Sequence, residues 1–141
     1  MMRGAMPPFT HQLRVRFHEC DPQGVVFYPT HLAYFDVVLT ELWRAAFGGY
    51  GKVLESGTDV HVVHTAFDFH APARFDDELA LSMEVVRIGQ TSITSHCEAR
   101  RDGELLVSGE LVHVCVETGG HAKVRVPDQL RAGLAPWSRQ T

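Results

Sequence analysis

The sequence predicts a single α+β domain in which one long helix lies against an antiparallel sheet of about five strands. Three observations support this fold class. Apolar residues recur at every second position over residues 11–18, change to a helical spacing after Thr30, and return to full or partial alternation in several segments beyond residue 60. The 141 residues suit one domain covering 1–141, with loose tails expected at 1–9 and 136–141. Because the helix covers one face of the sheet, the free edge and the other face favour dimerisation.

The long helix is expected to begin with Thr30 as its N-cap and to stop at Gly48 and Gly49. A helix of about 16 residues would be roughly 24 Å long. A polar connection is expected over 52–59. The apolar side chains recur at i, i+3, i+7, i+10, i+11 and i+14, which predicts one buried stripe on the helix: Leu32, Phe35, Leu39, Leu42, Trp43 and Ala46.

The remaining strands follow from alternation and turn residues. In the first strand, Leu13, Val15 and Phe17 are expected to be buried. Asp102-Gly103 is typical of a tight hairpin turn, and Pro127 is expected to open a short final helix. The expected strands cover residues 11–18, 60–71, 78–88, 91–100 and 104–117.

Charge and cysteine content exclude several classes of function. Lys+Arg 13 against Asp+Glu 17 gives 13 − 17 = −4, which argues against a nucleic-acid partner. No signal-peptide core and no run approaching about 18 apolar residues is present, so no membrane span is predicted. The three cysteines have no CxxC spacing, which is typical of reduced thiols and predicts a cytoplasmic protein.

The histidines do not predict a metal site. His61 and His64 have an odd separation, so a regular strand would point them to opposite faces. His64 and His70 would share a face, but six residues of about 3.3 Å each separate them by roughly 20 Å. These histidines are therefore interpreted as structural or pocket-lining. Cys20 is interpreted as a packing residue, because only His18 beside it could supply a positive charge.

Asp21 is the principal candidate for chemistry. It opens the turn DPQG, and the simplest interpretation is that its carboxylate caps its own loop. The short apolar run 25–27 and the helix start near Thr30 then bring it close to free backbone N–H groups and the positive end of the helix dipole. A carboxylate facing such a site is sufficient to hydrolyse an activated ester such as a thioester.

The segment CDPQGVVFYPTHLAYFD resembles the catalytic segment of hot-dog-fold acyl-CoA thioesterases, of the 4-hydroxybenzoyl-CoA type and the type encoded with the Tol-Pal envelope system. The likeness resumes at FDFHAPARFDDELAL and RIGQTSIT, and covers about residues 12–116. It implies a hot-dog fold, in which the sheet wraps a long central helix. It also implies acyl-CoA hydrolysis without a cofactor, in a homodimer or homotetramer with the site at the dimer interface.

The resemblance assigns roles by position. Asp21 corresponds to the catalytic carboxylate, acting as general base or nucleophile, and the backbone N–H of Tyr28 to the oxyanion donor. Gly24 would allow close approach of the substrate. The positions that would bind the substrate are Gly24, Phe27, Tyr28, His31, Phe35 and Arg87.

The chain departs from the family pattern at two places. Tyr28 matches the aromatic-CoA branch, whereas the Tol-Pal branch has histidine there. The basic cluster that binds CoA phosphates in the aromatic-CoA branch aligns with residues 89–91 (Gly-Gln-Thr), and only Arg87 lies near it. Either nucleotide binding is weaker, or the thiol carrier is not CoA, or other arginines serve: Arg74, Arg100 or Arg101.

Two alternatives remain open from the sequence. A hot-dog protein that binds acyl-CoA without turnover would not need Asp21, because a buried carboxylate is costly in a site for an apolar chain. A hot-dog hydratase or dehydratase would need a histidine facing Asp21, and His61 and His64 are the side chains to check across an interface. The sequence does not specify the acyl group.

Overall fold

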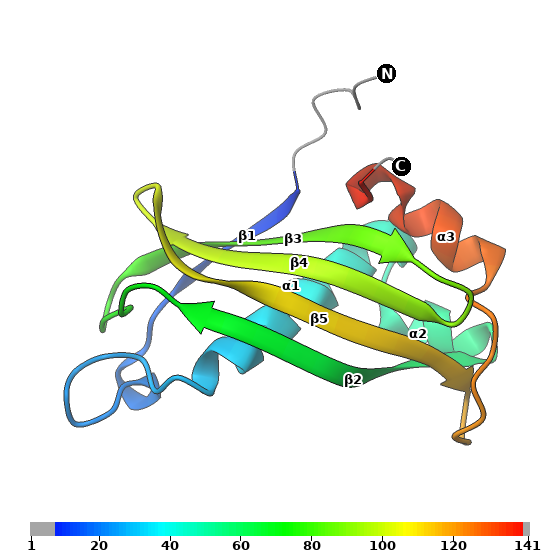
Figure 1. Cartoon of the computed structure of the whole chain (residues 1–141), viewed down its shortest axis with the longest axis horizontal. Coiled ribbons are helices and arrows are strands. Elements are labelled where there is room, and N and C mark those ends of the chain that lie inside the picture. Colours follow the sequence, from blue (N-terminus) through cyan, green and yellow to red (C-terminus); the bar gives the residue numbers. More distant parts are fainter. Residues whose placement is uncertain (1–7, 140–141) are drawn as a thin grey trace.

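The computed structural model describes residues 8–139. An antiparallel sheet of five strands, in the order β1-β3-β4-β5-β2, wraps around α1, which crosses one of its faces (Figure 1). The predicted α+β class with a long central helix is confirmed. The elements are β1 (Phe9–Arg14), η1 (Phe17–Glu19), α1 (Thr30–Phe47), α2 (Tyr50–Glu55), β2 (Thr58–Phe69), β3 (Glu78–Ile88), β4 (Ser92–Arg101), β5 (Glu104–Glu117), α3 (Asp128–Leu134) and η2 (Ala135–Trp137).

Helix α1 has 18 residues, so it is about 27 Å long. It ends as predicted, because Gly48 adopts φ 87° and its N–H donates to the Arg44 carbonyl at 2.9 Å. The predicted buried stripe was wrong at its start, since Leu32 is 42% exposed. The stripe was counted from apolar residues, so it missed the two polar aromatic side chains, His31 and Tyr34, that begin the buried face. That face consists of His31, Tyr34, Phe35, Val38, Leu42 and Trp43.

The core lies between α1 and the inner face of the sheet. Alternate residues of β3 are fully buried there, including Leu79, Leu81 and Met83. Across the same interface the Phe35 ring of α1 stacks on the Phe67 ring of β2, with ring centroids 5.1 Å apart. Burying a large apolar side chain stabilises the fold by about 1.5–3 kcal/mol, so this packing fixes the position of α1 on the sheet.

The strand boundaries agree closely with the alternation in the sequence, apart from β1. Leu13 and Val15 are buried as predicted, but Phe17 is 77% exposed, because the chain leaves the strand at Arg14 and turns into η1. The predicted hairpin turn is confirmed by positive φ at Asp102 and Gly103. The expected polar connection over 52–59 instead contains most of α2 and the start of β2.

A register shift in β2 overturns the predicted orientation of two histidines. His61 lies opposite Val114 and His64 opposite Val112, with the irregularity between Val62 and His64. Since Val112 and Val114 are two positions apart on β5, both histidines point to the same face of the sheet. That face is the one directed away from α1. Among residues 8–139, no group of three or more His, Cys, Asp or Glu side chains could hold a metal ion.

The ends of the described chain are held more firmly than the sequence indicated. Phe9, expected in a loose tail, begins β1. Within 136–139, Ser138 forms a parallel bridge with Val85, the Arg139 N–H donates to the Val85 carbonyl at 2.7 Å, and the Arg139 guanidinium pairs with Glu84. The rest of the two predicted tails lies outside the described residues. Across residues 8–139 no helix is both long and apolar enough to cross a membrane.

His113 of β5 is buried in this core at 3% exposure, and its Nε2 has no hydrogen-bond partner among the described residues. It lines a small internal cavity of about 10 Å³ with Ser95 and apolar side chains of α1 and the sheet. Burial lowers the pKa of His113 to about 4, although the Asp36 carboxylate acts in the opposite direction. The ring is therefore neutral in the folded protein at neutral pH.

We expect His113 to make the fold acid-sensitive. The folded-state pKa lies below the value of about 6.5 in the unfolded chain, so the unfolded chain binds the proton first as the pH falls. The stabilising contribution is complete above pH 6.5 and decreases toward pH 4. At pH 5 the loss from this group is about 2 kcal/mol. Urea unfolding at pH 7.5 and 5.0 checks this, and His113→Gln should reduce the difference between the two free energies of unfolding. An equal difference in both proteins would contradict the assignment.

Candidate active site

The segment between η1 and α1 forms a tight loop that is fastened to the rest of the molecule. The Asp21 N–H donates to the Val25 carbonyl at 2.8 Å, and the Val26 N–H donates to the Ala73 carbonyl at 2.8 Å in the β2–β3 connection. Gly24 has φ +81°, a conformation that other L-residues rarely adopt. The turn itself therefore favours glycine here, and the close approach of a substrate to Gly24 stays a prediction.

The carboxylate of Asp21 has one anchored and one free oxygen. Its Oδ1 accepts hydrogen bonds from the backbone N–H groups of Gln23 at 2.8 Å and Val25 at 3.5 Å. The simplest interpretation from the sequence, a carboxylate that caps its own loop, is therefore correct for Oδ1. Within residues 8–139, Oδ2 makes no hydrogen bond or ion pair. One carboxylate thus has a structural oxygen and a second oxygen that is available for chemistry.

The start of α1 offers a free backbone donor. Pro29, rather than the predicted Thr30, occupies the N-cap position, no side chain caps the helix, and its first turn contains no acidic residue. The N–H groups of Thr30 and His31 donate to the carbonyls of Phe27 and Tyr28. The Tyr28 N–H has no acceptor in the described part of the chain. The positive end of the helix dipole is therefore not neutralised, and one N–H remains available for an anionic oxygen.

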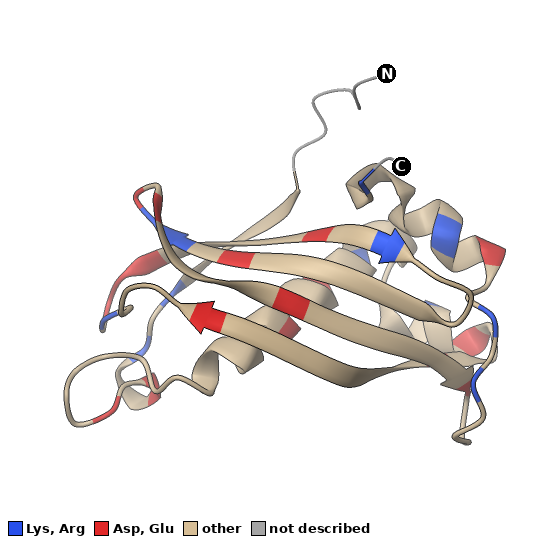
Figure 2. Ribbon diagram, in the orientation of Figure 1, with Lys and Arg blue, Asp and Glu red and all other residues tan. Residues whose placement is uncertain are grey.

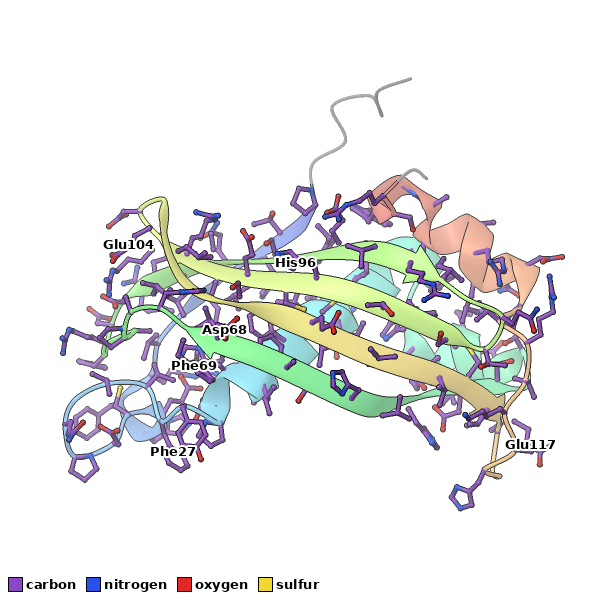
Figure 3. The ribbon with its side chains drawn as sticks, in the orientation of Figure 1. Phe27, Asp68, Phe69, His96, Glu104 and Glu117 are labelled. Carbon is purple, nitrogen blue, oxygen red and sulfur yellow. The ribbon has the colours of Figure 1, made fainter. Side chains whose placement is uncertain are left out.

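A hollow of about 270 Å³ opens beside this donor. Exposed aromatic rings stand around it, with Tyr28 in edge contact with both Phe27 and Phe69. Figure 3 shows Phe27 and Phe69 at the same end of the molecule, close to the start of α1. The hollow is lined by Val26, Tyr28, His31, Phe69, His70, Ala71 and Pro72.

His31 forms the buried wall of this hollow, at 4% exposure. Its ring packs against the rings of Tyr34 and Phe69, and its Nδ1 has no partner among the described residues. Burial lowers the pKa of His31 to about 4, so the ring is neutral at pH 7. Neither His31 nor His18 hydrogen-bonds Asp21 in the described chain. Tyr28 and His31 thus line one hollow, and their role in binding substrate stays a prediction.

The sequence did not single out the partly buried network of hydrogen bonds that supports this loop. The Glu19 carboxylate accepts hydrogen bonds from the Tyr34 hydroxyl at 2.8 Å and from the Arg16 side chain at 2.6 and 2.9 Å. The Glu19 carbonyl also accepts the Phe27 N–H at 3.0 Å. Burial raises the pKa of Glu19, but the bonds from Arg16 and Tyr34 outweigh it, so the net shift is downward. The i, i+3 pairing of Arg16 with Glu19 was the available signal in the sequence.

Two other predicted site residues lie elsewhere. Phe35 is fully buried in the core against Phe67 and does not line the hollow. Arg87 lies near the end of β3, beside α3, whereas the Asp21 loop is at the opposite end of the molecule (Figure 1). Within one protomer the structure therefore does not bring Arg87 together with Asp21.

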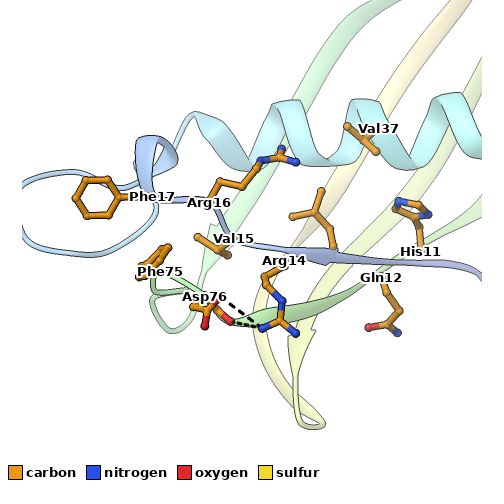
Figure 4. A pocket seen from close by; sticks show the side chains of 10 residues that line it. His11, Gln12, Arg14, Val15, Arg16, Phe17, Val37, Phe75 and Asp76 are labelled. Carbon is orange, nitrogen blue, oxygen red and sulfur yellow. Dashed lines mark hydrogen bonds and ion pairs between the residues drawn. The ribbon is translucent and has the colours of Figure 1, made fainter.

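A larger hollow of about 530 Å³ lies between β1 and α1, but its basic side chains are already paired (Figure 4). Arg14 bonds the carbonyl of Asp76 at 2.8 Å and lies 3.6 Å from its carboxylate and 3.5 Å from that of Glu78. Arg16 is bound to Glu19. Both arginines that line this hollow are therefore already bound to acidic residues or a backbone carbonyl.

A model of the thioesterase superfamily matches residues 23–108. The chain belongs to this superfamily. The match includes Tyr28 and Arg87, and begins just after Asp21.

The acyl-CoA thioesterase YbgC of Haemophilus influenzae is 27% identical over 127 residues, covering 89% of this chain and 93% of that protein. The acyl-CoA thioester hydrolase YbgC of Escherichia coli is 26% identical over 85 residues. The chain spans less than two thirds of the first curated relatives it matches, at 62% and 63% of their lengths.

Solved structures show the same fold. The dynemicin thioesterase superimposes with a TM-score of 0.85 at 23% identity, covering 96% of this chain and 100% of that one. A 1,4-dihydroxy-2-naphthoyl-CoA thioesterase from Synechocystis gives 0.82 at 20% identity, covering 92% of this chain and 96% of that one. Together with the superfamily match, these likenesses confirm the predicted hot-dog fold.

Substitution of Tyr34 tests whether its hydrogen bond to Glu19 stabilises the folded protein. Tyr34→Phe removes one hydrogen bond to a charged carboxylate and should reduce the free energy of unfolding by about 1–2 kcal/mol. Tyr28→Phe is the matched control, because the Tyr28 hydroxyl is exposed and unbonded in the described chain, and its effect should stay within about 0.5 kcal/mol. Urea denaturation measures both. Equal effects of the two substitutions would show that Glu19 does not depend on Tyr34.

Proposed function

We propose that this chain hydrolyses acyl-CoA thioesters to a free acid and coenzyme A. The observation that carries the proposal is the pairing of two free groups in one short segment: the Tyr28 N–H at an uncapped helix start, and Oδ2 of Asp21 seven residues earlier. Superfamily membership and relatives named as acyl-CoA thioesterases support the same reaction.

In the proposed reaction the thioester carbonyl oxygen accepts the Tyr28 N–H, which stabilises the negative charge of the tetrahedral intermediate. One donor of this kind is typically worth about 2.7–4 kcal/mol. As general base, Asp21 takes a proton from water while the water oxygen bonds to the carbonyl carbon. The C–S bond then breaks, and the thiolate receives the proton held by Asp21. If Asp21 attacks directly, its carboxylate oxygen bonds to the carbonyl carbon and the C–S bond breaks, which releases the CoA thiolate and leaves an acyl-aspartyl anhydride. Water then hydrolyses the anhydride to the free acid and the Asp21 carboxylate, and the thiolate takes up the released proton.

The hollow beside the helix start is the proposed place of the acyl group. Its aromatic rim presents an apolar surface to a bound acyl chain or ring, and the buried His31 ring of its wall is uncharged. A thiolate is a far better leaving group than an alkoxide, which explains why one carboxylate without a general acid is sufficient. A carrier-protein thioester would meet the same groups and is the alternative substrate class.

The two other functions considered have weaker support. A hydratase needs a histidine facing Asp21, and no histidine bonds Asp21 within the described part of one chain. His61 and His64 lie on the sheet face directed away from α1. A pure binding protein would not require Asp21 to keep a free carboxylate oxygen in the same short segment as a free oxyanion donor.

Replacing Asp21 tests the proposal. Asp21→Asn keeps the side-chain volume and an acceptor for the Gln23 N–H, but removes the base and nucleophile. Thiol release from aromatic, short-chain and long-chain acyl-CoAs should fall by about 10²–10⁴-fold in kcat, while acyl-CoA binding is retained. Asp102→Asn is the matched control, because Asp102 is exposed in the β4–β5 turn at φ 51°, which asparagine also tolerates.

The result can contradict the proposal in two ways. Wild-type protein that releases thiol from none of these esters would exclude hydrolysis of this class of CoA ester. If the Asp21→Asn variant releases thiol as fast as the Asp102→Asn control, a group other than Asp21 acts as the base.

We also propose that two copies pair edge to edge along β2 into a homodimer, which can double into a homotetramer, with the site at the dimer interface. Strand β2 has 12 residues and forms a free edge of the sheet. Large apolar side chains are exposed along this edge and beside the hollow: Phe27, Tyr28, Leu32, Val62, Val63 and Phe69. A second copy would cover them.

A charge placed on this edge should separate the copies. Val62 is 53% exposed on β2, and Val62→Glu should shift the mass measured by light scattering from dimer toward monomer and lower thioesterase activity in parallel. Gln12→Glu, on the opposite edge strand β1, is the control and should leave the mass unchanged. A monomeric wild type, or a Val62→Glu variant that stays dimeric, would contradict β2 pairing.

A cytoplasmic location is proposed on the state of the cysteines. Cys20, Cys97 and Cys115 are all free thiols, and Cys97 and Cys115 are buried. Burial raises the pKa of Cys97 to about 12, so its thiol is inert toward oxidation. Unpaired cysteines are typical of a reducing compartment.

A further inference from the structure

The register shift in β2 gives two histidines a spacing that their separation in the sequence did not indicate. His61 lies opposite Val114 and His64 opposite Val112. Because these valines are two positions apart on β5, the two histidines occupy successive outward positions of β2, with Cα atoms about 7 Å apart. Two side chains at this spacing on one face of a strand can both reach a single metal ion.

His61 is oriented by a carboxylate that is itself held in place. Its Nε2 lies 3.1 Å from Oδ2 of Asp59. The Tyr50 hydroxyl donates to Oδ1 of Asp59, and the Val60 N–H donates to the same oxygen at 2.8 Å. The bond from Tyr50 is the main cause that lowers the pKa of Asp59, so this carboxylate is ionised at neutral pH. The Nε2–H of His61 therefore donates to Asp59, and its Nδ1 makes no hydrogen bond in the described chain.

His64 has a carboxylate beside it as well. Its Nε2 lies 3.9 Å from Oε1 of Glu110 on β5, and its side chain is 57% exposed. The side chain of His61 is 43% exposed. Histidines that bind metal ions commonly donate their second ring N–H to a carboxylate, which fixes the ring and raises the basicity of the ligating nitrogen. Both histidines have such a carboxylate within reach.

One chain supplies only two of the ligands that a stable site needs. A structural zinc site has four protein ligands in nearly every case. The part of the chain from residue 8 to residue 139 contains no group of three or more His, Cys, Asp or Glu side chains suited to a metal ion. His61 and His64 lie, however, on the edge strand of the sheet, where another chain can approach.

A second copy paired along β2 would supply the other two ligands. Pairing of two β2 edges about a two-fold axis is antiparallel, so the middle of one strand lies beside the middle of the other. The irregularity next to His64 is near the middle of β2. If His64 of each copy lies opposite His61 of the other, the inward residues 58 and 60 lie opposite the inward residues 67 and 65, which keeps the core faces aligned. The four imidazoles then project from the same outer face, with directly opposite Cβ atoms about 4.5–5.5 Å apart.

The charges around the two histidines favour a cation. Strand β2 contains two aspartates and no Lys or Arg. Figure 2 shows the face of the sheet directed away from α1, with acidic segments on β2, β4 and β5. A metal ion approaching the middle of β2 is therefore attracted by the surrounding carboxylates and meets no basic side chain of this strand.

We propose that His61 and His64 of two copies bind one Zn²⁺ on the two-fold axis of the β2 dimer. Imidazole nitrogen suits Zn²⁺, at a distance of about 2.0–2.1 Å. Four protein ligands leave no open position, so the role of this ion is structural: it holds the two strand edges together. This assignment rests on the β2 dimer given with the proposed function, and it does not depend on thioester hydrolysis.

Direct binding tests the site. ZnCl₂ is titrated by calorimetry at pH 7.5 into metal-free protein without an affinity tag, as wild type, His61→Gln, His64→Gln and the control His96→Gln. His96 is on the same face with Nε2 2.9 Å from Glu98, but it belongs to the inner strand β4. The wild type should bind one Zn²⁺ per two chains. Each of the first two substitutions removes two of the four ligands and should raise Kd about 100-fold or more, whereas the control should leave Kd unchanged.

Two results of this titration would overturn the proposal. The first is equal affinity in all four proteins, or no binding to the wild type. The second is one Zn²⁺ per chain, which would show an adventitious ion only.

Light scattering separates the failure of the metal site from the failure of the dimer. The concentration at which the wild-type dimer dissociates should be about tenfold lower or less in Zn²⁺ than in EDTA, and His61→Gln should abolish this difference. A dimer that dissociates at the same concentration in Zn²⁺ and in EDTA would overturn the metal site and leave β2 pairing intact. A wild type that is monomeric under both conditions would overturn both. Thiol release is not a readout here, so loss of the proposed hydrolysis would not affect either result.

Discussion

The burial of α1 against the inner face of the sheet is the constraint on which the site depends. The Phe35 ring on Phe67 and the buried side chains of β3 fix where the helix lies. Because the helix is held along its whole length, its uncapped first turn occupies a defined position beside the Asp21 loop. The Tyr28 N–H can therefore remain unpaired, since the stability of the helix comes from packing rather than from its cap.

Asp21 shows how one side chain can serve both the fold and the proposed chemistry. Its Oδ1 closes the loop, and the Glu19 network holds the same segment from the other side through Arg16 and Tyr34. An anchored carboxylate loses little conformational freedom when a substrate binds, and its remaining oxygen is directed by the turn. The structural interpretation of Asp21 and the catalytic one are therefore compatible.

Most of the fold followed from alternation, the helical period and turn residues, and the motif around Asp21 correctly indicated the superfamily. The failures have identifiable causes. The irregularity next to Val62 reverses the side-chain alternation along β2, so His61 and His64 point to the same face. No local sequence pattern predicts such a bulge. Leu32 was assigned to the core because the helical stripe was counted from apolar residues, whereas the polar His31 and Tyr34 are the buried residues of the first turns. The Glu19–Tyr34 hydrogen bond joins two residues in different segments of the chain, which periodicity cannot detect.

The most direct measurement is a crystal structure of the Asp21→Asn variant with an intact acyl-CoA. The account predicts a dimer in which the thioester carbonyl oxygen lies within about 3 Å of the Tyr28 backbone nitrogen, with the side chain at position 21 beside the carbonyl carbon or a water next to it. A carbonyl oxygen bound by other donors, with the Tyr28 N–H paired to the protein itself, would contradict the account.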